Sequence, residues 1–307
     1  MLAQKFAAGL FEDSMTHSTN ASLAVLLDNP VHRRVALEAA EQGIVMLLNR
    51  NDTLPLTLSA LERVGAYGGG KGVALIGEAS SCVYDNASAV GIGGRAARRS
   101  GRHDDQCPAQ LDMLGKTQHK VGNVDIVTVA DAISRINAAA AAADADAASP
   151  MPLSGTRLGA FVDMPTPEDE KAAAVALAAS SSMALLVLGD SEKSCGEWGD
   201  RSTLSLPGDQ PELLRRVLET GVPTVLVLVH GRPVSFDIEP SSNPAGHTSL
   251  LDYPNLAAVL AAWRPGEEGG VTVVNALRGT MVTGAGGPSG RLPQAWPQSA
   301  GQIGGTL

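Results

Sequence analysis

The strongest constraint on the fold comes from short apolar runs that close on, or next to, a glycine. Such runs are typical of strands that are buried on both faces of a parallel sheet. The interior strands are expected at Val73–Ile76, Leu185–Leu188 and Val225–Val229. Glycine follows the first two runs directly, as Gly77 and Gly189, and the third is followed by His230-Gly231.

Segments with helical character separate these runs. Helices are expected over His32–Leu48, Glu168–Ala179, Gln210–Glu219 and Gly266–Leu277, and Leu256–Trp263 supplies another apolar element. Strands and helices that alternate in this way predict an α/β fold, with a mostly parallel sheet of about five or six strands flanked by helices on both faces. Ligands of such sheets lie beyond the carboxyl ends of the strands. The segments to watch therefore follow Gly77, Gly189, Val229 and Trp263.

Composition excludes several classes of function. The chain has 23 Lys+Arg against 32 Asp+Glu, a formal net charge of -9, so nucleic acid and anionic membrane surfaces are not expected as partners. The three cysteines show no zinc spacing, and we expect no metal and no cofactor. No apolar run of the sequence is long enough to span a bilayer, and the first residues lack the apolar core of a signal peptide.

A glycine-rich stretch raises the question of nucleotide binding. Residues Gly65–Gly72 nearly fit a phosphate-binding loop, but Gly72 stands where the metal-binding Ser or Thr belongs. A strand also follows the stretch, whereas a phosphate loop needs a helix. A nucleotide-binding doubly wound domain is therefore the least favoured of the functions considered.

The segment Gly189–Gly208 is rich in side chains capable of acid/base chemistry or substrate binding. It carries the acids Asp190, Glu192, Glu197 and Asp200. An acid beside a large ring such as Trp198 can have a raised pKa, which suits a general acid, and Arg201 can orient carboxylates or hydroxyls. From composition alone, an exposed acidic loop with a local Asp200–Arg201 pair is the simpler interpretation.

The same segment resembles a known family. Residues Gly196–Arg201, then Leu204–Gly208 and Gln210, look like the C-terminal domain of glycoside hydrolase family 3, the β-glucosidase and β-xylosidase group. Further motifs stand in the family order: His32-Arg33 to Ala40, Ile44–Asn49, Leu54–Leu56, Val73–Gly77, Val225–Val229 with Gly231–Pro233, Trp263 with Pro265–Gly270, Pro288–Pro293 and Trp296-Pro297.

The resemblance implies a role for particular residues. The family places its acid/base glutamate four residues before an arginine, which assigns that role to Glu197 ahead of Arg201. It makes Trp198, Asp200 and Arg201 candidates for substrate binding or support. The family retains anomeric configuration through a covalent glycosyl-enzyme, which needs a second carboxylate as nucleophile. That residue lies in an N-terminal barrel domain of the family, so no nucleophile is expected in this chain.

The resemblance also implies an organisation. Residues 1–31 are expected to be a linker like the one that leaves the barrel, and 32–307 an α/β domain with an irregular insertion at about 78–120. The expected function is part of a retaining β-glycosidase that is inactive alone, with a β-glucoside or β-xyloside as substrate and a barrel domain as partner in cis or trans. The family is compatible with an extracellular location. The alternative is a non-catalytic carbohydrate-binding or interaction module on the same fold.

Overall fold

A computed structural model of the chain describes residues 1–7, 9–11, 29–66, 70–77, 127–142, 150–162, 165–191, 194–195, 199, 201–238, 246–284, 286–297, 299 and 302. Its strands are β1 (Val45–Asn49), β2 (Val73–Ile76), β3 (Leu153–Arg157), β4 (Met183–Gly189), β5 (Thr224–Val229) and β6 (Leu256–Trp263). Its α-helices are α1 (Leu2–Ala7), α3 (Pro30–Gly43), α4 (Leu58–Arg63), α6 (Val129–Ala142), α7 (Glu168–Ser180), α8 (Gln210–Glu219) and α9 (Gly269–Arg278). The short 3-10 helices are η1 (Arg50–Asp52) and η4 (Leu250–Asp252).

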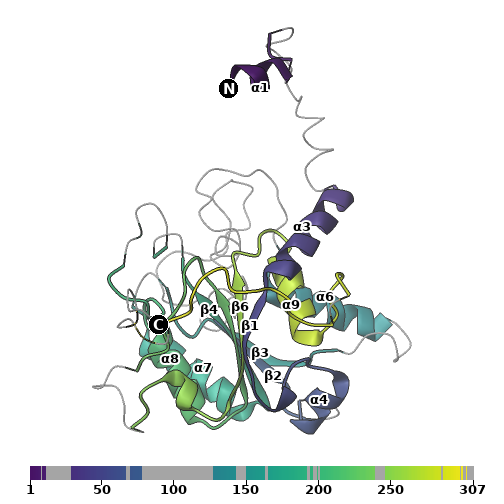
Figure 1. Cartoon of the computed structure of the whole chain (residues 1–307). Coiled ribbons are helices and arrows are strands. Elements are labelled where there is room, and N and C mark those ends of the chain that lie inside the picture. Colours follow the sequence, from purple (N-terminus) through teal and green to yellow (C-terminus); the bar gives the residue numbers. More distant parts are fainter. Residues whose placement is uncertain are drawn as a thin grey trace.

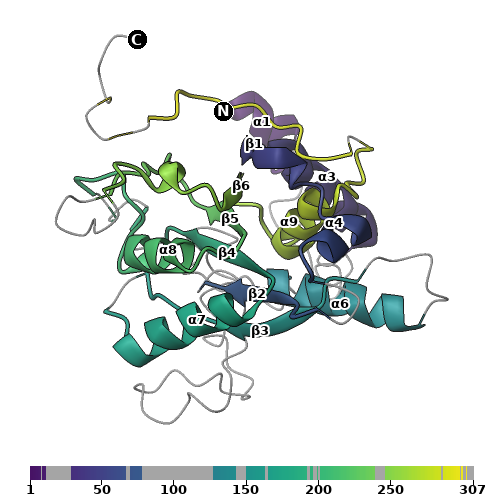
Figure 2. The same ribbon diagram turned by 90° about the horizontal axis from the view of Figure 1, so that it is seen from below.

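The strands form one sheet of six, in the order β1-β6-β5-β4-β2-β3. Strand β1 runs antiparallel to β6, and every other pair of neighbours is parallel. Helices α4, α6 and α9 lie on one face, with α3 packed against α9, and α7 and α8 lie on the other (Figures 1 and 2). The predicted α/β class and the predicted mostly parallel sheet are confirmed, and so are its three interior strands.

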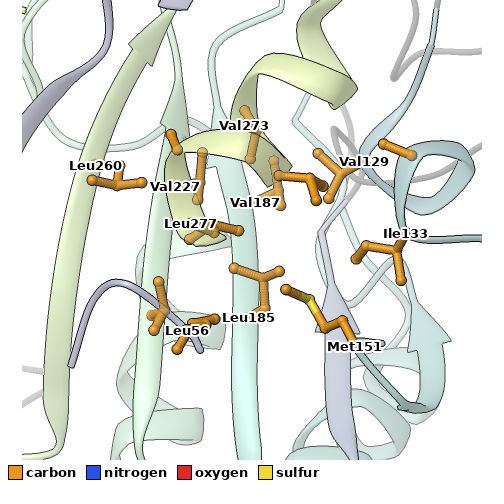
Figure 3. Packing of buried hydrophobic residues seen from close by; sticks show 14 of the residues in the cluster. Leu56, Val129, Ile133, Met151, Leu185, Val187, Val227, Leu260, Val273 and Leu277 are labelled. Atoms are coloured by element: carbon orange, nitrogen blue, oxygen red, sulfur yellow. The ribbon is translucent and has the colours of Figure 1, made fainter. Parts of the chain in front are cut away.

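Each interior strand sends alternate side chains into two separate cores, because successive residues of a strand point to opposite faces. On one face, Leu185 and Val187 pack with α6 and α9 residues such as Ile133 and Leu277 (Figure 3). On the other face, Leu186 and its neighbours pack with α7 and α8. Burial on both sides explains why the interior strands appear in the sequence as unbroken apolar runs.

The helix expected over His32–Leu48 is correct only in its first part. Helix α3 ends at Gly43, Ile44 adopts an extended conformation, and Val45–Asn49 form strand β1. Residues 44–48 form an unbroken apolar run, so its periodicity does not distinguish a helix from a strand. Residues Val45–Asn49 form a strand because they pair with β6, whose edge would otherwise have no neighbouring strand. The expected insertion at about 78–120 lies outside the described residues.

Within the ranges that the structure describes, no helix has both the length and the apolar character needed to cross a membrane.

Candidate functional site at the carboxyl edge of the sheet

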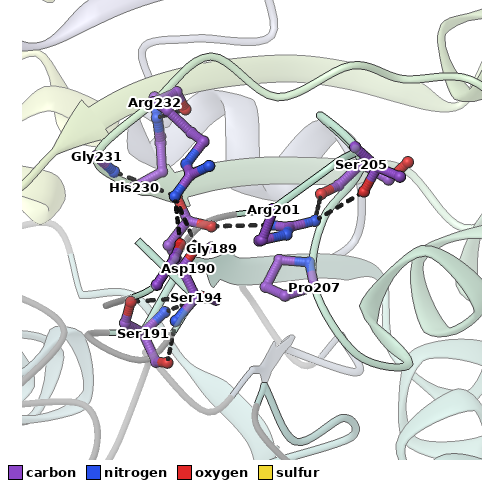
Figure 4. A network of polar contacts seen from close by, with 12 residues as sticks. Gly189, Asp190, Ser191, Ser194, Arg201, Ser205, Pro207, His230, Gly231 and Arg232 are labelled. Carbon is purple, nitrogen blue, oxygen red and sulfur yellow. Dashed lines mark hydrogen bonds and ion pairs between the residues drawn. The ribbon is translucent and has the colours of Figure 1, made fainter. Parts of the chain in front are cut away.

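Polar residues gather where the parallel strands end. Asp190 follows β4, His230 and Arg232 follow β5, and Arg264 follows β6. Because neighbouring parallel strands present their carboxyl ends at the same edge, residues far apart in the chain meet there (Figure 4). The edge predicted to hold the site thus does carry a connected polar network.

Asp190 is the buried centre of this network. Its side chain is 0% exposed, and its Oδ1 lies 3.1 Å from Nη1 of Arg201. Its Oδ2 accepts a hydrogen bond from the Gly231 amide at 3.4 Å. Burial raises the pKa of Asp190, and the Gly231 amide and the charges of Arg201, Arg264 and Arg232 oppose that rise. Those contacts satisfy both oxygens of a carboxylate that water does not reach.

Arg201 connects the later part of the segment Gly189–Gly208 to the end of β4 through its ion pair with Asp190. Besides the Asp190 ion pair, its Nη2 donates to the carbonyl of Ser205 and to Oγ1 of Thr203. The expected partner, Asp200, lies outside the described residues. The partner that the structure gives is Asp190, at the end of the preceding strand.

Gln210 closes the base of the segment. Its buried side-chain amide accepts from the Gly189 amide at 2.8 Å, and it donates to the carbonyls of Gly189 and Pro207 at 2.8 and 3.0 Å. Gly189 itself permits a close approach of two backbones: a Cβ there would lie 1.6 Å from the carbonyl oxygen of Val229. The first residue of α8 therefore holds both ends of the segment against the sheet.

An aromatic cluster flanks the network on the β5–β6 side. The ring of His230 lies 4.8 Å from that of Trp263 and 5.3 Å from that of Trp296, measured between centroids. Trp296 donates from its indole nitrogen to the Val234 carbonyl at 2.9 Å. Burial lowers the pKa of His230 to about 4, so this imidazole is neutral at pH 7. Its Nδ1 then donates to the Arg232 carbonyl at 2.6 Å.

Among the predicted site residues, Arg201 is placed by the structure, whereas Glu197, Trp198 and Asp200 lie outside the described residues. The described neighbours on either side, Ser194 and Gly199, are held to the sheet edge. Sequence reasoning gave no role to His230, Arg232 or Arg264. A signal was present, since these residues follow Val229 and Trp263, where the sequence indicates the ends of apolar elements.

Among the described residues, the arrangement holds the buried carboxylate of Asp190 close to several positive charges. Three guanidinium groups, from Arg201, Arg232 and Arg264, surround the single carboxylate of Asp190. Within the described part of the chain, no group of three or more His, Cys, Asp or Glu side chains is arranged to hold a metal ion.

Comparison with known proteins gives a consistent picture. The family model of the glycosyl hydrolase family 3 C-terminal domain matches residues 44–306. A β-xylosidase of Formosa agariphila is 28% identical over 305 residues, which cover 99% of this chain and 33% of that protein. A periplasmic β-glucosidase of Salmonella typhimurium is 26% identical over 99% of this chain and 34% of its own length. The chain thus spans about a third of these relatives.

Solved structures share the fold. A Listeria innocua β-glucosidase in complex with glucose aligns with a TM-score of 0.65 at 22% identity, over 98% of this chain and 31% of that one. A β-glucosidase involved in saponin metabolism from intestinal bacteria aligns with a TM-score of 0.63 at 25% identity, over 98% and 38% of the two chains. The sheet and its helices therefore share their fold with about a third of each of these larger proteins.

Proposed function

The chain belongs to the glycosyl hydrolase family 3 C-terminal domain family, and on that premise we propose that it supplies the general acid/base of a retaining β-glycosidase. The proposed acid/base is Glu197. The observation that carries the proposal is that the backbone on both sides of Glu197, at Ser194 and Gly199, is hydrogen-bonded to Arg232 just after the end of β5. Ligands of open α/β sheets bind at that edge.

The chemistry needs two carboxylates. In the first step the acid protonates the departing glycosidic oxygen while a nucleophile attacks the anomeric carbon from the opposite face. In the second step the same residue, now a carboxylate, takes a proton from the water that releases the sugar. The two carboxyl groups of a retaining enzyme lie only about 5–5.5 Å apart, so the nucleophile must approach Glu197 closely.

We place that nucleophile outside this chain. The relatives are about three times as long, which leaves room for a barrel domain that binds the sugar, in cis or in trans. Residues 1–31 would then be the linker from the barrel, and 32–307 the domain that presents the acid/base. The isolated chain is proposed to be inactive.

The other predicted residues have supporting roles in this scheme. Arg201 secures the segment through Asp190 and the Ser205 carbonyl. Trp198 and Asp200 follow Glu197 closely in the sequence, and they are proposed to bind substrate or to support the acid/base. The relatives' names point to a β-glucoside or a β-xyloside as substrate.

The proposal is tested by restoring the missing part. The chain is joined to the portion of the F. agariphila β-xylosidase that it does not match, and hydrolysis of aryl β-xylosides and β-glucosides is measured. We expect no turnover by the chain alone or by the added portion alone, and measurable turnover by the joined protein. A folded joined protein without turnover, together with sugar binding by the chain alone, would instead identify the chain as a non-catalytic carbohydrate-binding module.

A further inference from the structure

We propose that Arg232 is a positioning residue, which fixes the segment that carries Glu197 by bridging the backbone on both sides of it. The purpose of this positioning rests on the proposed function, which makes Glu197 the acid/base. The hydrogen bonds that Arg232 makes come from the structure alone. Arg232 is not assigned any contact with substrate. It acts through the backbone carbonyls of Ser194 and Gly199.

The bridge is made by a single nitrogen. Nη2 of Arg232 donates to the Ser194 carbonyl at 2.9 Å and to the Gly199 carbonyl at 2.9 Å. Those two oxygens can then be no farther apart than twice that distance. A guanidinium nitrogen carries two N–H groups in a fixed plane, so one group can satisfy two acceptors without reorganisation. The carbonyl groups of Ser194 and Gly199, which lie on either side of Glu197 in the sequence, are therefore held at one place on the sheet edge.

Arg232 is itself fixed to the sheet edge. Its carbonyl accepts from Nδ1 of His230 at 2.6 Å, and the His230 amide donates to the Trp263 carbonyl at 2.9 Å. The His230 ring packs against Trp263 and Trp296, which leaves it little freedom to move. The turn that bears Arg232 is thus connected both to β6 and to the aromatic cluster.

Gly231 brings the segment into direct contact with the same turn. A Cβ at Gly231 would lie 2.6 Å from Sγ of Cys195, so the segment packs where a side chain would otherwise stand. Arg264 secures the entry to the segment, because its Nη1 donates to the Asp190 carbonyl at 3.0 Å. Three independent contacts therefore dock the residues after β4 on the residues after β5 and β6.

Docking of this kind matters for a general acid. The acid must stand within about 2.6–3.2 Å of the oxygen that it protonates, and a misplacement of about 1 Å can lower a rate on the order of 10²-fold. Glu197 works on a substrate that another domain holds. We expect the backbone anchors at Ser194 and Gly199 to limit where the Glu197 carboxyl group can lie relative to that domain.

The two hydrogen bonds from Arg232 to the carbonyls of Ser194 and Gly199, called the clamp below, can be tested in the chain as it is. Lys193 precedes Ser194, so trypsin cleavage after Lys193 reports on release of the segment, and amide exchange over 194–199 reports on it independently. Loss of hydrogen bonds from a charged donor predicts that Arg232→Met accelerates both by about 10–100-fold. Arg232→Lys, which keeps a multiple donor, is expected to fall between wild type and Arg232→Met. Gly231→Ala, which displaces Cys195, is expected to accelerate both processes and serves if Arg232→Met does not fold.

Arg50 offers a matched control. Its guanidinium also donates to backbone carbonyls, those of Leu251, Tyr253 and Leu256, but at the start of β6, at the opposite edge of the sheet. Arg50→Met should lower stability without accelerating cleavage after Lys193 or exchange over 194–199. Equal rates in the Arg232 and Arg50 variants, at equal stability, would overturn the inference.

A second measurement separates the clamp from the proposed function. In the joined protein, Arg232→Met should lower kcat for alkyl glycosides, which need protonation, by about 10–100-fold, and should affect an activated nitrophenyl glycoside far less. If Glu197→Gln shows this selectivity and Arg232→Met does not, the positioning role is wrong. If Glu197→Gln itself lacks the selectivity while Arg232→Met still releases the segment, the proposed function fails and the clamp stands.

Discussion

At the scale of single residues, the carboxyl edge of the sheet depends on polar groups that are buried and satisfied by one another. Asp190 is fully buried, and the Arg201 guanidinium and the Gly231 amide compensate it. This role also argues against Asp190 as an acid/base, because its oxygens are engaged inside the protein. Arg232 instead donates hydrogen bonds to backbone carbonyls, and every residue has a backbone carbonyl whatever its side chain. No pattern of residue types could have shown which carbonyls Arg232 would reach.

Removing Asp190 should therefore be costly. Asp190→Ala leaves the largely buried guanidinium of Arg201 without its carboxylate, and we expect a loss of about 3–5 kcal/mol in the free energy of unfolding. The exposed pair Arg34–Glu38 is the control, since Glu38→Ala should cost at most about 0.5 kcal/mol. Urea unfolding at pH 7 measures both. Similar losses in the two variants would contradict the assigned role of Asp190.

His230 predicts a dependence of stability on pH. Burial lowers the pKa of His230 from 6.5 to about 4, so on acidification the unfolded chain binds a proton before the folded chain does. The stability due to neutral His230 is complete above pH 6.5 and is lost as the pH falls toward 4. We expect wild type to lose about 2 kcal/mol more than His230→Asn between pH 7 and pH 5. Parallel losses in urea unfolding would show that His230 does not keep its lowered pKa.

At the scale of elements, the sequence predicts the interior strands better than the edge strands. β2, β4 and β5 are buried on both faces, and that burial imposes the apolar runs from which they were predicted. Edge strands carry a weaker signal: β3 is the mixed sequence Leu153–Arg157, and β1 was taken for the end of a helix. Both are strands because a neighbouring strand offers them hydrogen bonds, which a local pattern does not record.

An interior strand should accordingly be sensitive to truncation. Leu186 lies in the middle of β4, is 0% exposed and packs against the layer of α7 and α8. We expect Leu186→Ala to lower the free energy of unfolding by about 2–5 kcal/mol, through lost burial and the cavity that remains. Leu292→Ala, at a side chain 40% exposed, should change it by about 0.5 kcal/mol or less. Thermal or urea unfolding decides, and a small effect at Leu186 would contradict the described core.

At the scale of the whole molecule, the chain belongs to the glycosyl hydrolase family 3 C-terminal domain family and spans about a third of the two relatives compared above. The sequence predicted the family and the edge of the sheet that bears the candidate site. It could not predict which strand ends meet, because that depends on the order β6-β5-β4-β2 and on the register between those strands. In the proposed scheme the two carboxylates of the reaction belong to different domains, so activity depends on how the domains are joined.

The most direct test of the central proposal is the dependence of rate on leaving group in the joined protein, with Glu197→Ala compared with wild type. Loss of the general acid should slow alkyl glycosides by about 10²–10⁴-fold, while the first step with a nitrophenyl glycoside is spared. Azide should then restore turnover of the activated substrate, because a small anion needs no base to attack the glycosyl-enzyme. Equal loss of all substrates, with no effect of azide, would show that Glu197 is not the acid/base.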